Sequence, residues 1–127
     1  MLFWILAGLG VFLANVLLPA IIYFTQSETL TSHVGSRDDD PEPSVWVARA
    51  RRSLANMHEN LPFFLTLGVL ALVVENVDMG QAILGAQMFV FARVAFMVLY
   101  VTGVPWLRTI SYLIGLVGCF KMALALI

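Results

Sequence analysis

Long apolar stretches constrain the fold of this chain more than any other feature of its sequence. Hydrophobic residues make up 61% of its 127 residues, against roughly 45–50% in soluble domains. A bilayer core about 30 Å thick needs about 20 apolar residues per helix, so a chain of this length holds about four spans. We therefore expect a single all-α domain over residues 1–127, an integral membrane bundle of four helices. The expected spans are about 2–24, 45–75, 80–101 and 106–127, and a polar connection covers about 25–44.

The second predicted span is longer than a membrane requires. Ser44 is a suitable N-cap, after which one helix can run to about Glu75. At 1.5 Å per residue it would be about 45 Å long, more than the hydrocarbon thickness. Its arginine-bearing first turns should therefore project toward water. Pro62 removes a backbone donor and is expected to bend this helix.

The arginines indicate how the bundle is oriented. They flank the first and third connections, whereas the second connection carries Glu75 and Asp78 and no basic residue. The flanking arginines are Arg37, Arg49, Arg51, Arg52 and Arg108. By the positive-inside rule, the first and third connections are cytoplasmic and both termini lie outside. In a bacterial inner membrane, the location we expect, both termini would be periplasmic.

Charge and cysteine content exclude several classes of function. The formal net charge is −1, and the basic residues cluster rather than covering a face, so nucleic-acid binding is not expected. Cys119 is the only cysteine, which excludes an intrachain disulfide and a CxxC site. His58 and Glu59 are not followed by a second histidine four residues on, so the zinc-protease pattern is absent and no metal is expected.

A polar stripe runs along the second predicted helix. Arg49, Arg52, Asn56 and Glu59 recur at steps of three and four, which places them on one face. Charges at the edge of a bilayer core are costly and by default indicate a functional site. The third span contains Arg93, which needs a partner, and Glu59 is the carboxylate at comparable depth. We expect these two residues to form an ion pair.

The spacing of these residues leaves a structural interpretation open. The same polar side chains could simply lock the helices together. Tyr100 lies seven residues after Arg93, and Tyr112 lies four after Arg108, so each tyrosine shares a helix face with an arginine. Tyrosines near a membrane interface are often anchors of the span, and their position alone favours that role.

Three motifs stand out in the sequence: R-x-x-R-x-x-x-N-x-x-E-N-x-P over residues 49–62, F-A-R-V at 91–94 and P-W-L-R-T-I-S-Y at 105–112. Together they resemble the MAPEG family, the membrane-associated proteins in eicosanoid and glutathione metabolism. The resemblance implies a homotrimer of four-helix protomers in membrane lipid, with glutathione held at the subunit interfaces near the cytoplasmic side. It implies that the residues contacting glutathione are Arg49, Arg52, Asn56, Glu59, Arg93, Tyr100 and Tyr112.

Arg108 occupies the position at which the family's synthases carry the arginine that holds the glutathione sulfur as thiolate. A free thiol has a pKa of about 8.5, and a neighbouring guanidinium favours the anion, which is the nucleophile. The resemblance thus implies an enzyme, a transferase or peroxidase that uses glutathione as co-substrate against lipophilic electrophiles or lipid hydroperoxides. The sequence also departs from the eicosanoid synthases: Gln26, Asn60 and Phe96 stand where those enzymes carry arginine, tyrosine and a polar or tyrosine side chain. Eicosanoid synthesis is therefore not supported.

Two alternatives come from other classes of protein. The first is a non-catalytic lipid-binding or scaffold membrane protein of the same fold, in which the polar residues hold a trimer together. The second is a small four-span exporter. An exporter usually needs a carboxylate deep in its first helix, where this chain has Asn15.

Overall fold

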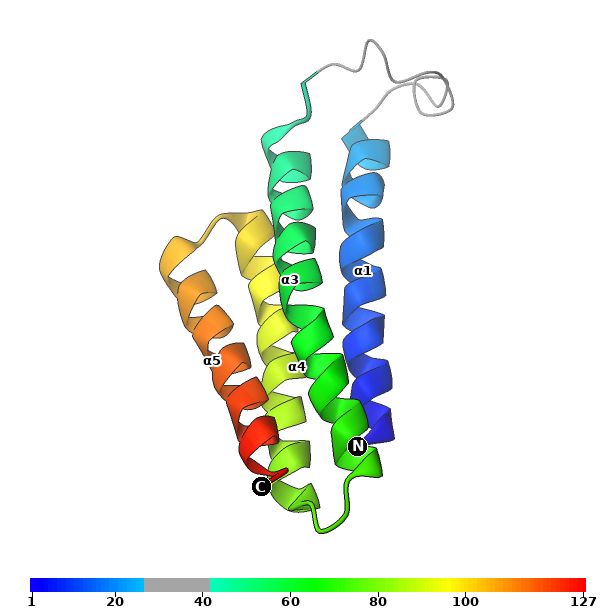
Figure 1. Cartoon of the computed structure of the whole chain (residues 1–127). Helices are drawn as coiled ribbons and strands as arrows, with labels where there is room; N and C mark the ends of the chain where they lie inside the picture. The colour runs from blue at the N-terminus through cyan, green and yellow to red at the C-terminus, as the bar shows by residue number, and fades with distance from the viewer. Residues whose placement is uncertain (27–41) are drawn as a thin grey trace.

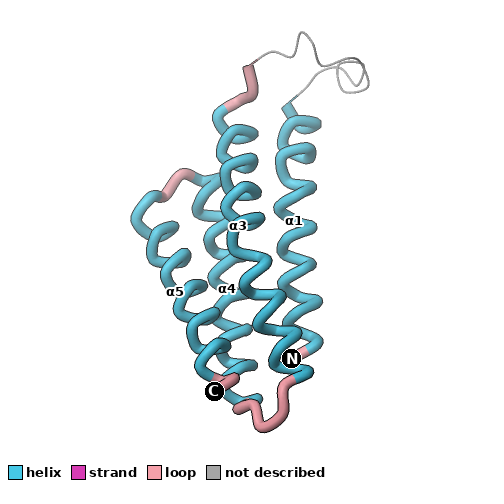
Figure 2. Tube along the Cα trace, viewed as in Figure 1, coloured by secondary structure: helices cyan, strands magenta, loops and turns pink. Residues whose placement is uncertain are grey.

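The computed structural model of the chain describes residues 1–26 and 42–127, and every regular element within them is an α-helix (Figure 2). The helices are α1 (Leu2–Gln26), α3 (Val45–Val73), α4 (Met79–Thr102) and α5 (Pro105–Leu124). Successive helices run in opposite directions, and both chain ends lie at the same end of the bundle (Figure 1). The predicted all-α architecture of four helices is confirmed. Most of the predicted polar connection, residues 27–41, lies outside the described residues.

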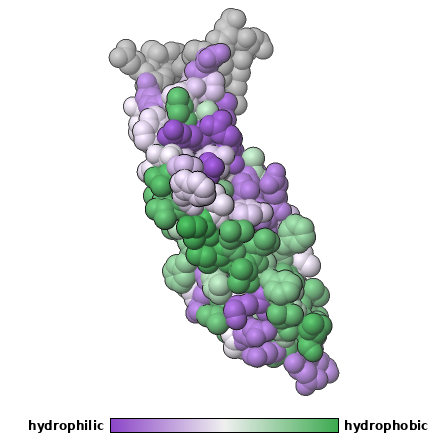
Figure 3. Space-filling view, turned by 90° about the vertical axis from the view of Figure 1, so that its left-hand side faces the viewer, coloured by the Kyte–Doolittle hydropathy of each residue, from purple (hydrophilic) through white to green (hydrophobic). Residues whose placement is uncertain are grey.

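Three of the described helices, α1, α4 and α5, are long and apolar enough to cross a membrane. Polar side chains occupy the first half of α3, up to Asn60, and lower its hydropathy. With 29 residues α3 is nevertheless about 44 Å long, as expected for a helix that extends beyond the hydrocarbon. In Figure 3, hydrophilic surface gathers near the end of the bundle where α1 ends and α3 begins, further hydrophilic patches lie near the opposite end, and hydrophobic surface covers much of the middle.

The ends of α3 are defined by local hydrogen bonding and backbone geometry. Ser44 is the N-cap, as predicted: its Oγ accepts from the backbone N–H of Val47 over 3.4 Å. The same hydroxyl donates to Gln26 Oε1, which joins the adjacent ends of α1 and α3. The helix ends at Val73, slightly before the predicted limit, because the next residue is extended with ψ 140°. Pro62 lies inside α3, and the ribbon changes direction along its length (Figure 1).

Aromatic stacking forms the centre of the core. The rings of Phe64 and Phe89 lie 4.3 Å apart between centroids and are almost parallel, at 6°. Both are fully buried, together with Met57 and Met122. A Cβ atom at Gly8 would collide with the Phe64 ring, so this glycine lets α1 approach the stacked pair. The core thus joins all four helices.

Two glycines allow α4 and α5 to pack tightly along their length. A Cβ at Gly85 would lie 2.5 Å from the carbonyl oxygen of Gly118, and a Cβ at Gly118 would lie equally close to the Gly85 oxygen. Gly115, Cys119 and Ala123 are small residues spaced by four on the same helix, a pattern that permits close packing. Gly115 and Cys119 are buried, but the closest approach is at Gly118.

Candidate functional site

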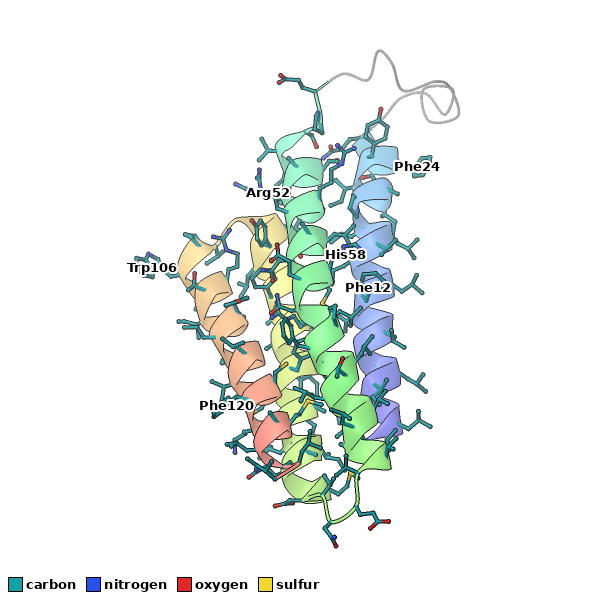
Figure 4. All side chains as sticks on the ribbon, in the orientation of Figure 1. Phe12, Phe24, Arg52, His58, Trp106 and Phe120 are labelled. Atoms are coloured by element: carbon teal, nitrogen blue, oxygen red, sulfur yellow. The ribbon has the colours of Figure 1, made fainter. Side chains whose placement is uncertain are left out.

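The polar stripe of α3 divides between the bundle and its surface. Asn56 and Arg49 are half-buried and contact α4, whereas Arg52 and Glu59 are exposed. In Figure 4, Arg52 lies on the side of α3 away from α1, and His58 lies on the side facing α1. The four residues therefore lie on α3 as their spacing predicts, but two of them contact α4 and two face away from the bundle.

Arg93 of α4 is a buried cation, with 2% of its surface exposed. Its Nη1 donates a hydrogen bond of 2.7 Å to Asn56 Oδ1. Its Nε and Nη2 are buried and have no hydrogen-bond partner in the described part of the chain. Gly115 of α5 lies beside these two nitrogens, since a Cβ there would be 3.4 Å from Nε and 3.5 Å from Nη2.

The predicted ion pair between Arg93 and Glu59 is wrong. Glu59 is exposed, and the α3 residue that meets Arg93 is Asn56, three positions earlier. Residues three apart on a helix differ in direction by about 60°, so the rotation of α3 that turns Asn56 toward α4 turns Glu59 outward. Asn60 Nδ2 donates to the backbone oxygen of Asn56 over 2.8 Å, which reinforces this face. The buried cation consequently has a neutral partner.

Aromatic rings surround the guanidinium of Arg93. Its Cζ lies 5.1 Å from the ring centroid of Phe89, 5.4 Å from that of Phe96 and 5.2 Å from that of Tyr112. Ring faces attract cations, and the attraction strengthens where water is excluded. These contacts partly replace the missing counter-charge. In the sequence, Phe96 stands out only as a departure from related enzymes. In the structure it contacts Arg93 and both tyrosines.

Arg108, in the first turn of α5, lies over the ring of Tyr100, with its Cζ 4.4 Å from the centroid. The Tyr100 ring in turn lies 5.3 Å from Phe96. Through Phe96 the two arginines therefore belong to one cluster, which also holds Tyr112. Both tyrosine rings thus lie against an arginine, and their interpretation as interface anchors stays a prediction.

A polar contact that the sequence did not predict joins α1 to α3. Ser53 Oγ donates to Asn15 Oδ1 over 2.9 Å, and Asn15 Nδ2 donates to the Val11 carbonyl over 3.0 Å. Asn15 and Ser53 are 2% and 1% exposed. The only signal in the sequence is the asparagine inside an apolar span, because serine is common in membrane helices.

Metal ligands do not gather in the described part of the chain, where no three His, Cys, Asp or Glu side chains are grouped. The site is instead built from arginines, an asparagine and aromatic rings. A guanidinium presents donors in a fixed fork that suits carboxylates and other anions.

The fold and the site define a class of protein: a bundle of apolar helices that carries a cationic, aromatic-lined cluster toward one end. Within that class the chain belongs to the MAPEG family, whose family model matches residues 3–127. It is therefore an integral membrane protein of a family associated with glutathione. A comparison with curated protein sequences found no match.

Proposed function

We propose that this protein binds glutathione beside Arg93 and Arg108 and uses its thiol against lipophilic electrophiles or lipid hydroperoxides. The observation that carries the proposal is the buried guanidinium of Arg93, with two nitrogens that no described residue accepts from. Nearly all buried N–H groups in proteins have an acceptor. A charge inside a membrane bundle is by default part of a functional site. An anionic peptide would supply both the acceptors and the counter-charge.

The exposed residues of α3 complement the remaining charges of glutathione. This peptide carries two carboxylates, one ammonium group and one thiol. Arg52 would bind a carboxylate and Glu59 the ammonium group, as the family resemblance implies. Asn56, Arg93, Tyr100 and Tyr112 would complete the pocket.

Arg108 is the proposed catalytic residue. It is half-buried and pairs with no carboxylate among the described residues, so its charge is available to a ligand. A guanidinium does not lose its proton at physiological pH, so it stabilises a nearby thiolate steadily. In conjugation, the sulfur would attack the electrophilic carbon as the leaving group departs with its electron pair, and the thiol proton would pass to water.

We also propose that the protein is a homotrimer and that neighbouring chains complete the site. Arg52 and Glu59 lie at the surface of the single chain, and a partner helix beside them would enclose the bound peptide. The location proposed is a bacterial inner membrane. The proposed orientation, with the arginine-rich end cytoplasmic and both termini periplasmic, rests on the positive-inside rule.

One observation favours the alternative, a non-catalytic lipid-binding or scaffold protein. The hydrogen bond from Arg93 to Asn56 already joins α3 and α4 without any ligand. If this were its whole role, Arg93 and Asn56 would affect stability and nothing else.

The direct test is conjugation of glutathione to chlorodinitrobenzene by the purified protein in detergent. We expect turnover by the wild type and a loss of roughly a hundredfold or more in Arg108→Ala, because one preorganised electrostatic contact is worth about that much. Arg108→Lys should retain part of the activity, because the charge remains. Absence of turnover in the wild type would refute the enzymatic role.

A further inference from the structure

A side chain of α3 holds the turn between α4 and α5. Arg49 Nη1 donates to the backbone oxygen of Val101 over 3.3 Å, across 52 positions of sequence. The carbonyls in the last turn of a helix lack intrahelical partners and carry its negative dipole end. A guanidinium there supplies both a donor and a favourable charge.

The end of α4 is shaped so that Arg49 fits against it. Gly103 has φ 84°, a left-handed conformation, and its N–H donates to Leu99 O over 3.0 Å. The N–H of Val104 donates to the same oxygen over 3.0 Å. These two bonds satisfy Leu99 and leave Val101 available to Arg49.

The guanidinium of Arg49 occupies the space above Gly103. A Cβ at that position would lie 2.6 Å from Nη1 and 2.7 Å from Cζ of Arg49. The ring of Trp46, one turn earlier on α3, lies 5.8 Å from the same Cζ. Glycine is thus required here for two reasons, the positive φ and the adjacent arginine.

The turn between α4 and α5, which Arg49 contacts, leads directly to Arg108. Only Gly103 and Val104 separate α4 from α5, and the N–H of Arg108 donates to Val104 O over 3.3 Å. The stacking partner of Arg108, Tyr100, lies in the last turn of α4. A shift of this short turn therefore moves the Arg108 guanidinium relative to its ring.

We propose that Arg49 is a positioning residue, which holds the α4–α5 turn and through it the guanidinium of Arg108, rather than a ligand of glutathione. The family resemblance implies a binding role for Arg49, but its Nη1 is already engaged by Val101. The part of the inference that concerns catalysis rests on the proposed function of Arg108. The part that concerns the turn stands on these contacts alone.

Hydrogen exchange tests, without any ligand, whether Arg49 holds the α4–α5 turn. In detergent-solubilised protein, Arg49→Gln should exchange the amide protons of Gly103 and Val104 faster than the wild type, and Arg49→Lys should restore part of the protection. Arg51→Gln is the matched control, because Arg51 is exposed and makes no hydrogen bond with a described residue. Equal exchange rates in Arg49→Gln and the wild type would refute the proposal that Arg49 holds the turn.

Kinetics then separate positioning from binding. With glutathione and chlorodinitrobenzene, Arg49→Gln should lower kcat by roughly ten- to a hundredfold, since small misplacements of a catalytic group cost about that much. The ultraviolet absorbance of bound thiolate should fall with it, while the glutathione Kd stays within about twofold. A raised Kd with normal kcat would instead identify Arg49 as a ligand and refute the proposal. If the wild type neither binds nor turns over glutathione, the proposed function fails. The hydrogen-exchange result alone then decides whether Arg49 holds the α4–α5 turn.

Discussion

Arg93 and Asn56 join α4 to α3 through a hydrogen bond of 2.7 Å between a buried cation and a neutral amide. A carboxylate in place of the amide would neutralise the arginine within the chain. The amide satisfies one donor and leaves the charge without a counter-ion, with two further nitrogens unpartnered among the described residues. A buried charge of this kind is costly in the free protein, and a bound anion would offset that cost, which is the basis of the proposed binding site.

The first prediction concerns this cost. Arg93→Met replaces the buried cation by an apolar chain. Replacing a buried ion pair by apolar residues is often neutral or stabilising by about 1–4 kcal/mol, and a buried cation without a counter-ion carries the same kind of desolvation cost. We expect the melting temperature of the ligand-free protein to stay the same or rise. We expect stabilisation by added glutathione to disappear, as measured by thermal shift in detergent.

A lower melting temperature with an unchanged glutathione response would show that Arg93 only holds helices together. Arg93→Lys serves as the control that keeps the charge and loses the planar fork. It should bind glutathione more weakly than the wild type while showing some response.

The second prediction concerns the bond between Asn15 and Ser53. Ser53→Ala removes the donor to Asn15 Oδ1, and interhelical hydrogen bonds in membrane proteins average about 0.6 kcal/mol. A double-mutant cycle with Asn15→Leu should give a coupling free energy of about this size, measured by unfolding in mixed detergent micelles. The glutathione Kd should not change, because neither residue belongs to the proposed site. Additive effects of the two substitutions would contradict the coupling.

Particular residues show how much of the fold and of the candidate site can be predicted from the sequence. The number of helices, the N-cap at Ser44 and the stripe on α3 follow from periodicity and composition, which depend on one helix at a time. The partner of Arg93 does not, because a choice between Asn56 and Glu59 depends on how α3 is rotated against α4. The same holds for Gly118, whose contact with Gly85 depends on the register of two helices. Packing between helices, rather than their existence, is what the sequence leaves undetermined.

The third prediction follows from the glycine contact between α4 and α5. In Gly118→Ala, the new Cβ would meet the backbone oxygen of Gly85 at 2.5 Å, and backbone atoms cannot rotate away. The helices must separate, at a cost of about 1–3 kcal/mol typical of overpacking. The melting temperature in detergent should fall by several degrees.

Gly10→Ala is the matched control for that substitution. Gly10 is exposed in α1, and a Cβ there meets nothing within 4 Å. Alanine is favoured over glycine in a helix by about 1 kcal/mol, so this variant should be at least as stable as the wild type. Equal losses in Gly118→Ala and Gly10→Ala would mean that the close contact does not exist.

The last prediction concerns the exposed charges of α3. Arg52 and Glu59 are exposed and form no ion pair with described residues, so Arg52→Gln and Glu59→Gln should leave the melting temperature of the ligand-free protein nearly unchanged. Each should raise the glutathione Kd by roughly tenfold or more, since a hydrogen bond to a charged group contributes about 1.5–3 kcal/mol. Arg51→Gln, on the same helix and also exposed, should bind as the wild type does. A loss of stability with unchanged affinity would instead show that these side chains hold neighbouring chains together and do not bind the peptide.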